Sequence, residues 1–213
     1  MKVTIVYDNC PAGPGLKTGW GFSCLIEVKG EAPLLFDTGA DGATLLHNMA
    51  RLHIDPQGIG IIVLSHAHGD HTGGLTGILE KNGHAEIYVP ASVMARLPGR
   101  RVTALGKPAP IMKDVFSTGE LRGGEQSLVV RTDRGVLVIT GCSHPGVGTI
   151  LEVASGYGEL YGIIGGLHGF SDFERLRCLS LICPCHCTQY KSRLSELFPE
   201  QYLACGAGLE LEL

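Results

Sequence analysis

The chain has 213 residues, of which 44% are hydrophobic and 18% charged, and its formal net charge is −4. This length suffices to bury a substantial core, and the composition is that of a globular protein rather than a disordered one. Because the lysines and arginines are scattered, the chain offers no charged footprint for a nucleic-acid backbone, so no nucleic-acid partner is expected. We expect a single domain over residues 1–213.

The amino-terminal residues 1–8 contain too short an apolar run for a secretory signal, and no stretch reaches the length of a membrane span. We therefore expect no membrane partner and a cytoplasmic location. In that compartment the eight cysteines would stay reduced.

The first half of the chain alternates strand and helix patterns, which is typical of an α/β fold. Strands are predicted at residues 3–7, 22–28, 33–36, 59–64 and 86–90, and helices at 43–52, 75–81 and 91–97. Residues 99–110 lie among Pro98, Pro108 and Pro110 and predict a loop. This loop would join two similar halves, approximately 1–98 and 111–213.

The second half restarts the strand pattern and places a histidine after each of three strands. Strands are predicted at 111–116, 127–132 and 136–140, with a tight turn at 133–135, and shorter apolar runs lie at 161–164 and 181–182. His144, His168 and His186 follow the last three of these strands. Because the carboxyl ends of neighbouring parallel strands form one edge, this pattern predicts a site there.

The densest group of polar side chains follows the apolar run 59–64. His66, His68, Asp70 and His71 fall within six residues, just before a glycine-rich turn. On an extended segment His66 and His68 point the same way, and Asp70 and His71 lie beyond, where the chain turns. Imidazoles and carboxylates are metal ligands, so this segment can offer ligands to two adjacent ions.

Asp37 ends the strand predicted at 33–36 and has two interpretations. An acidic residue at this place can cap the following helix. Beside a metal motif, it can instead accept the far N–H of a ligand imidazole and so fix the tautomer of that ring.

The pattern from His66 to His71 resembles the H-x-H-x-D-H signature of the metallo-β-lactamase superfamily. Further short motifs occur in this chain: FDTG at 36–39, TGCSHPG at 140–146, GGLH at 165–168 and HCT at 186–188. Their order resembles that in the branch of the superfamily that includes the methanopterin-pathway dihydropterin ribofuranosylaminobenzene-phosphate synthases. The resemblance covers nearly the whole chain. It implies an αββα four-layer sandwich, in which two mixed sheets pack together with helices outside.

The resemblance also implies two sets of metal ligands and a carboxylate that orients one of the ligands. His66, His68 and His144 would hold one divalent ion, Asp70, His71 and His186 a second, and Asp37 would orient a ligand imidazole. These residue types suit zinc, and they are also compatible with manganese or iron. One or two ions per chain are therefore expected.

The chain departs from the superfamily at residues 165–168, where an aspartate usually bridges the two ions. No carboxylate follows until Asp172. The second site is therefore expected to be weaker. His168 could enter the coordination sphere, or an ion could be loosely held, but we favour a His168 that faces the substrate or supports a ligand.

The function indicated is a metal-dependent hydrolase or synthase that acts through a metal-activated water on a small anionic substrate, either phosphorylated or pterin-like. Asp70 would ligate metal and orient the nucleophile, and His168 would protonate the leaving group. The alternative is a metal- or cofactor-binding redox or sensor module with little hydrolytic activity, motivated by the missing carboxylate and the many cysteines. The oligomeric state stays open.

The cysteines near His186 lack the two-residue gaps of a zinc ribbon or a ferredoxin loop, so most are expected to be packing residues. Cys185 and Cys187 flank His186, and on an extended segment they would point to the opposite face. Cys142 is expected to be a small buried residue beside His144. Three other histidines, His47, His53 and His84, are expected at the surface or at caps.

Overall fold

Two β-sheets packed face to face form the centre of the structure, a computed structural model that describes residues 1–93 and 97–213. The first sheet has the order β13 (Glu210–Glu212), β1 (Lys2–Tyr7), β2 (Ser23–Glu27), β3 (Leu34–Phe36), β4 (Ile61–Val63), β5 (Glu86–Pro90), β6 (Val102–Leu105). The second has the order β12 (Leu181–Cys185), β11 (Leu160–Gly166), β10 (Gly135–Thr140), β9 (Leu128–Thr132), β8 (Val115–Ser117), β7 (Ala109–Met112).

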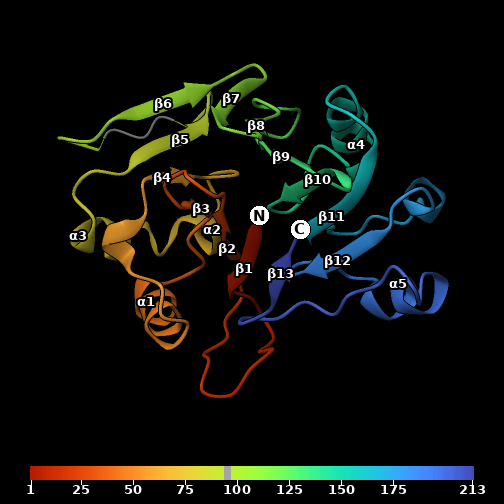
Figure 1. Cartoon of the computed structure of the whole chain (residues 1–213), viewed down its shortest axis with the longest axis horizontal. Coiled ribbons are helices and arrows are strands. Elements are labelled where there is room, and N and C mark those ends of the chain that lie inside the picture. The colour runs from red at the N-terminus through yellow and green to blue at the C-terminus, as the bar shows by residue number, and fades with distance from the viewer. Residues whose placement is uncertain (94–96) are drawn as a thin grey trace.

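Helices cover the outer face of each sheet. Helices α1 (Gly42–Arg51) and α3 (Leu75–Lys81) lie on one side of the molecule, and α4 (Val147–Ser155) and α5 (Lys191–Leu197) on the other (Figure 1). Short helices α2 (Gly69–Thr72), η1 (Pro56–Gly58) and η2 (Phe173–Leu176) lie in the connections. The predicted α/β fold class, an αββα sandwich with two mixed sheets, is confirmed. Among the described residues, no helix is long and apolar enough to cross a membrane.

Strand β10 shows how the sequence produces these layers. Leu137 and Ile139 join the core between the two sheets, whereas Val136 and Val138 join the core that includes residues of α4 and α5. Successive strand side chains point to opposite faces, so a continuous apolar strand is buried on both of its faces.

Replacing Ile139 with alanine should lower the free energy of unfolding by about 2–5 kcal/mol, because the side chain is fully buried and its loss leaves a cavity. Ile139→Val, which removes one methylene, should cost only about 0.5–1.5 kcal/mol. Urea unfolding of the two variants measures both losses. Equal losses would contradict this packing.

Several predicted elements are confirmed, including α3, β5 and the hairpin of β9 and β10. The predicted loop 99–110 is wrong, because it contains β6 and the start of β7. Pro110 lies in β7, which is an edge strand, the place in a sheet where a residue without N–H is tolerated. The single strand predicted at 111–116 is also wrong, because Asp114 turns with a φ of 60° and separates β7 from β8. The helix predicted at 91–97 includes 94–96, which lie outside the described residues.

The strand directions bring the polar strand ends together. Strands β3 and β4 are parallel in the first sheet, and β10, β11 and β12 are parallel in the second. Their carboxyl ends carry the segments that contain Asp37, His66, His144, His168 and His186. The strand ends predicted to carry the site therefore lie together, at the place where the two sheets meet.

Candidate metal centre

Two groups of potential metal ligands converge at these strand ends. Side-chain ligand atoms within each group lie within 4.8 Å of one another, and the groups consist of His66, His68 and His144, and of Asp70, His71 and His186. The rings of His66 and His71 bring the groups together, since their centroids are 4.3 Å apart. The structure thus brings together both sets that the sequence indicated.

Asp37 lies at the base of this arrangement and is fully buried. Its carboxylate accepts hydrogen bonds from the backbone N–H and the hydroxyl of Ser65 and from Nδ1 of His71, each at 2.7 Å. Helix α1 is capped by a different residue, Asp41, which accepts from the N–H of Thr44. Asp37 is therefore placed to orient an imidazole, and the helix-cap interpretation of it is wrong.

These hydrogen bonds select the ring tautomers. His71 donates its Nδ1–H to Asp37, which leaves the lone pair on Nε2. The Ser65 hydroxyl donates to Asp37, so its oxygen accepts from Nδ1 of His66 at 2.8 Å. Both rings consequently present an unprotonated Nε2 to the centre, the form that binds a metal ion.

His186 is held from the opposite side by residues that follow β1. Its backbone N–H donates to Asp8 at 2.8 Å, and its Nδ1 donates to Oδ1 of Asn9 at 3.0 Å. Its Nε2 lies 3.1 Å from Oδ2 of Asp70. This ring also directs Nε2 toward the other potential ligands.

Burial and charge set the protonation of these rings. Burial, and repulsion from the His71 ring when that ring is protonated, lower the pKa of His66 to about 3 and that of His186 to about 4. Burial also lowers the pKa of His144. Burial alone would lower the pKa of His71 as well, but the charge of Asp37 and its hydrogen bond outweigh burial and raise it. The rings of His66, His144 and His186 are therefore neutral near pH 7.

Glu125, which sequence reasoning did not assign a role, positions His144. It is fully buried and accepts hydrogen bonds from three successive backbone N–H groups, those of Cys142, Ser143 and His144, at 2.8 to 3.0 Å. The next residue, Gln126, donates its side-chain N–H to the carbonyl of Leu64 at 2.9 Å. The buried Glu125–Gln126 pair, which lies just before β9, thus connects the segment of His144 to the segment of His66.

Replacing Glu125 with alanine should leave these three amides without partners and lower the free energy of unfolding by about 3 kcal/mol. The displaced His144 should also weaken metal binding by about 10–100-fold, as is typical of residues that orient ligands. Denaturant unfolding and metal titration measure the two effects. The exposed Glu152→Ala on α4 is the control, and equal behaviour of both variants would contradict the role of Glu125.

Positive backbone φ angles mark the strand ends that carry the site. Asp37, Ser143, His168 and His186 have φ between 41° and 62°, a region that residues other than glycine seldom adopt. Such strain clusters at functional sites. It also corrects one prediction, because the turn at His186 ends the extended alternation and brings Sγ of Cys187 within 4.8 Å of a ring nitrogen of His186. Cys187 therefore faces the site.

His168 belongs to neither group of ligand atoms. Its exposed ring lies 5.4 Å from that of His144, between ring centroids, and both residues line a cavity of about 270 Å³. This location fits a side chain that faces a bound molecule. His53 and His84 are exposed, and His47 contacts the carbonyl of Gly15 at 2.9 Å, so all three lie outside the site as predicted.

The residues fit a divalent metal ion. Nε2 of His144 is buried and has no hydrogen-bond partner among the described residues, which is costly for a polar atom unless something binds it. It belongs to a ring that faces His66 at 4.9 Å and His68 at 5.0 Å, between ring centroids. A cation at this point would satisfy the orphaned nitrogen.

Two proteins of Methanocaldococcus jannaschii are similar to this chain in sequence. The chain is 28% identical to the 7,8-dihydropterin-6-methyl-4-(beta-D-ribofuranosyl)-aminobenzene-5'-phosphate synthase of Methanocaldococcus jannaschii, with 88% of each chain covered. It is 30% identical to an uncharacterized protein of the same organism, with 83% of this chain and 88% of that one covered.

The fold is similar to that of Tm1679, a metal-dependent hydrolase of the beta-lactamase superfamily, with a TM-score of 0.80, 27% identity and coverage of 100% of this chain and 99% of that one. The family model of the metallo-beta-lactamase superfamily matches residues 21–156. This match spans more than half of the sequence and includes the histidine motif at the centre of the site. The chain therefore belongs to the metallo-beta-lactamase superfamily.

Proposed function

We propose that this protein is a metal-dependent hydrolase or synthase that acts on a small anionic substrate, either phosphorylated or pterin-like. The convergence of His66, His68 and His144 beside Asp70, His71 and His186 is the observation that carries this proposal. A divalent ion held by these residues, with zinc first and manganese or iron as alternatives, lowers the pKa of a water molecule and polarises a carbonyl or phosphoryl oxygen.

Asp70 and His168 are the side chains proposed to act on the reacting groups. The carboxylate of Asp70 is 22% exposed and lies 3.1 Å from Nε2 of His186, so it can both ligate and hold a nucleophilic water in place. His168 lies beside His144, and both residues line the same cavity. From there its ring can donate a proton to a leaving group.

Two observations support the substrate class. The similarity to the M. jannaschii dihydropterin ribofuranosylaminobenzene-5'-phosphate synthase covers most of both chains and favours a phosphorylated pterin-like molecule. The indole ring of Trp20 is 63% exposed and lies 4.9 Å from the ring of His186, between centroids. Such an exposed aromatic surface beside the centre can pack against a flat heterocycle.

Substrate profiling of the purified protein tests the proposal. The protein is stripped with a chelator, reloaded with zinc, manganese or iron, and offered phosphodiesters, lactones, thioesters and a pterin together with a ribosyl phosphate. We expect turnover that disappears on stripping and returns on reloading. Consumption of the pterin and the ribosyl phosphate only as a pair would select the synthase over the hydrolase. Full turnover by the stripped protein would contradict metal dependence.

A redox or sensor module is the second candidate, because Cys142 and Cys187 lie among the potential ligand atoms. Elemental analysis with an absorbance spectrum separates the two. Bound iron with a visible chromophore would favour the module. Colourless zinc or manganese near two ions per chain would count against it.

A further inference from the structure

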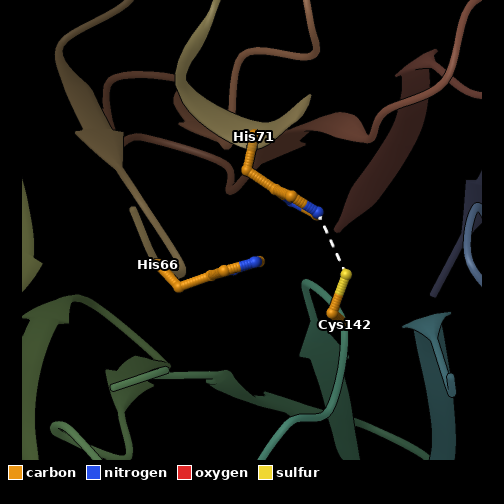
Figure 2. A group of neighbouring side chains, drawn as sticks. All are labelled: His66, His71 and Cys142. Atoms are coloured by element: carbon orange, nitrogen blue, oxygen red, sulfur yellow. Dashed lines mark hydrogen bonds between the residues drawn. The ribbon is translucent and has the colours of Figure 1, made fainter. Parts of the chain in front are cut away.

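A thiol lies between the two groups of ligands. Sγ of Cys142 is 3.2 Å from Nε2 of His71, and Figure 2 shows it pointing from the strand end of β10 toward His71, with the ring of His66 beside it. Ligand atoms of Cys142, His66 and His71 lie within 4.8 Å of one another, and so do those of Cys142, His186 and Cys187. Among the residues that the structure describes, Cys142 is thus the one found in a group with rings of both ligand sets and in a group with a second thiol.

The backbone holds this sulfur in place. Cys142 is buried, and its N–H donates to Glu125 at 2.8 Å, in the same cradle that holds His144. The sulfur faces the lone pair of His71 Nε2, because Nδ1 of that ring donates to Asp37. The thiol therefore occupies a fixed position aimed at a ligand nitrogen rather than at an apolar surface.

The end of the neighbouring strand β11 has no room for a side chain at Gly166. A Cβ at Gly166, the last residue of β11, would lie 2.6 Å from Sγ of Cys187 and 2.4 Å from the carbonyl oxygen of Gly141. Both distances are too short for any side chain at this position. Gly166, in the stretch where a bridging aspartate is expected, therefore cannot be replaced by a carboxylate, and Sγ of Cys187 occupies the adjacent space.

We propose that Cys142 is a metal ligand of the second site, together with Asp70, His71 and His186. This inference rests on the proposed metal-dependent function. When the ion binds, the thiol releases its proton to solvent and the sulfur forms a bond to the ion. A thiolate favours zinc, iron or cobalt over manganese or magnesium, which prefer oxygen ligands. Cys142 would thereby set the metal preference of the centre.

Cobalt substitution tests this ligand directly. The stripped full-length protein is loaded with Co²⁺, and its absorption is recorded in the near ultraviolet, where a thiolate bound to cobalt gives a charge-transfer band. We expect the band in the unmodified protein and its loss in Cys142→Ser. It should persist in Cys178→Ser, an exposed cysteine, and in Cys205→Ser, which belongs to the separate thiol group of Cys183, Cys185 and Cys205. Persistence of the band in Cys142→Ser, or its loss in Cys205→Ser instead, would overturn the assignment.

A second measurement needs no variant. X-ray absorption of the zinc-loaded protein should show a sulfur neighbour at about 2.3 Å from zinc. Zinc bound with only nitrogen and oxygen neighbours would overturn the thiolate ligand while leaving the proposed function intact. A protein that binds neither cobalt nor zinc would overturn both.

Discussion

His66→Ala is expected to bind about one metal ion fewer per chain and to lose more than about 100-fold in turnover. Mutating a residue that only hydrogen-bonds to a ligand already lowers metal affinity or activity by about 10–100-fold, and losing a ligand itself should cost more. His66 carries an Nε2 lone pair directed at the centre, and its ring lies within 5 Å, between centroids, of those of His68, His71 and His144. Its removal therefore weakens both ligand groups. Elemental analysis after gel filtration measures the metal content.

A second ligand variant and a control variant accompany this measurement. His68→Ala removes an exposed ring from the same ligand group and should reproduce the loss of metal without threatening the fold. His84→Ala removes an exposed histidine outside both groups and should retain full metal content. Unchanged metal content in both His66→Ala and His68→Ala would show that the ion binds elsewhere.

Asp37→Ala is expected to lower the free energy of unfolding by about 3–5 kcal/mol, because it removes a buried charge and leaves buried donors unpaired. Three hydrogen bonds of 2.7 Å are lost, two from Ser65 and one from His71. The freed His71 ring can rotate, so metal affinity should fall by about 10–100-fold as well. Urea unfolding in the presence of a chelator separates the loss of stability from the loss of metal.

The variant Asp37→Asn separates the effect of losing the carboxylate charge from the effect of losing the side-chain shape. Asparagine tolerates the positive φ at this position, so this variant should fold, yet its NH₂ group cannot accept from His71 or Ser65. We expect weaker metal binding with a smaller loss of stability than in Asp37→Ala. Asp133→Asn, in the exposed turn between β9 and β10, is the control. Wild-type metal affinity in Asp37→Asn would contradict the orienting role.

The parts of the site that the sequence predicts are those encoded by local patterns. An apolar run followed by a histidine marks a strand end, and parallel strands bring such ends to one edge, so His66, His144 and His186 could be anticipated to meet. Asp37 was likewise foreseeable from its place after a strand. These inferences depend on residues close in sequence and on one general rule of sheet topology.

The parts that escaped prediction depend on contacts between distant segments. Glu125 follows two glycines and precedes a strand, and nothing local reveals that its carboxylate receives three N–H groups from residues 142–144. The alternation of an extended segment predicts the wrong face for Cys187, because it fails at the positive φ of His186. Prolines on both sides of β6 favour a loop in the sequence, but none lies within β6, and Pro110 lies in β7, an edge strand that tolerates it.

Anomalous diffraction at the zinc edge from crystals of the zinc-loaded protein tests the central claim most directly. The account predicts a first anomalous peak contacted by His66, His68 and His144, and a second among Asp70, His71 and His186 where zinc occupies both sites. Zinc found only at another place, such as the thiols of Cys183, Cys185 and Cys205, with none beside His66, would contradict it.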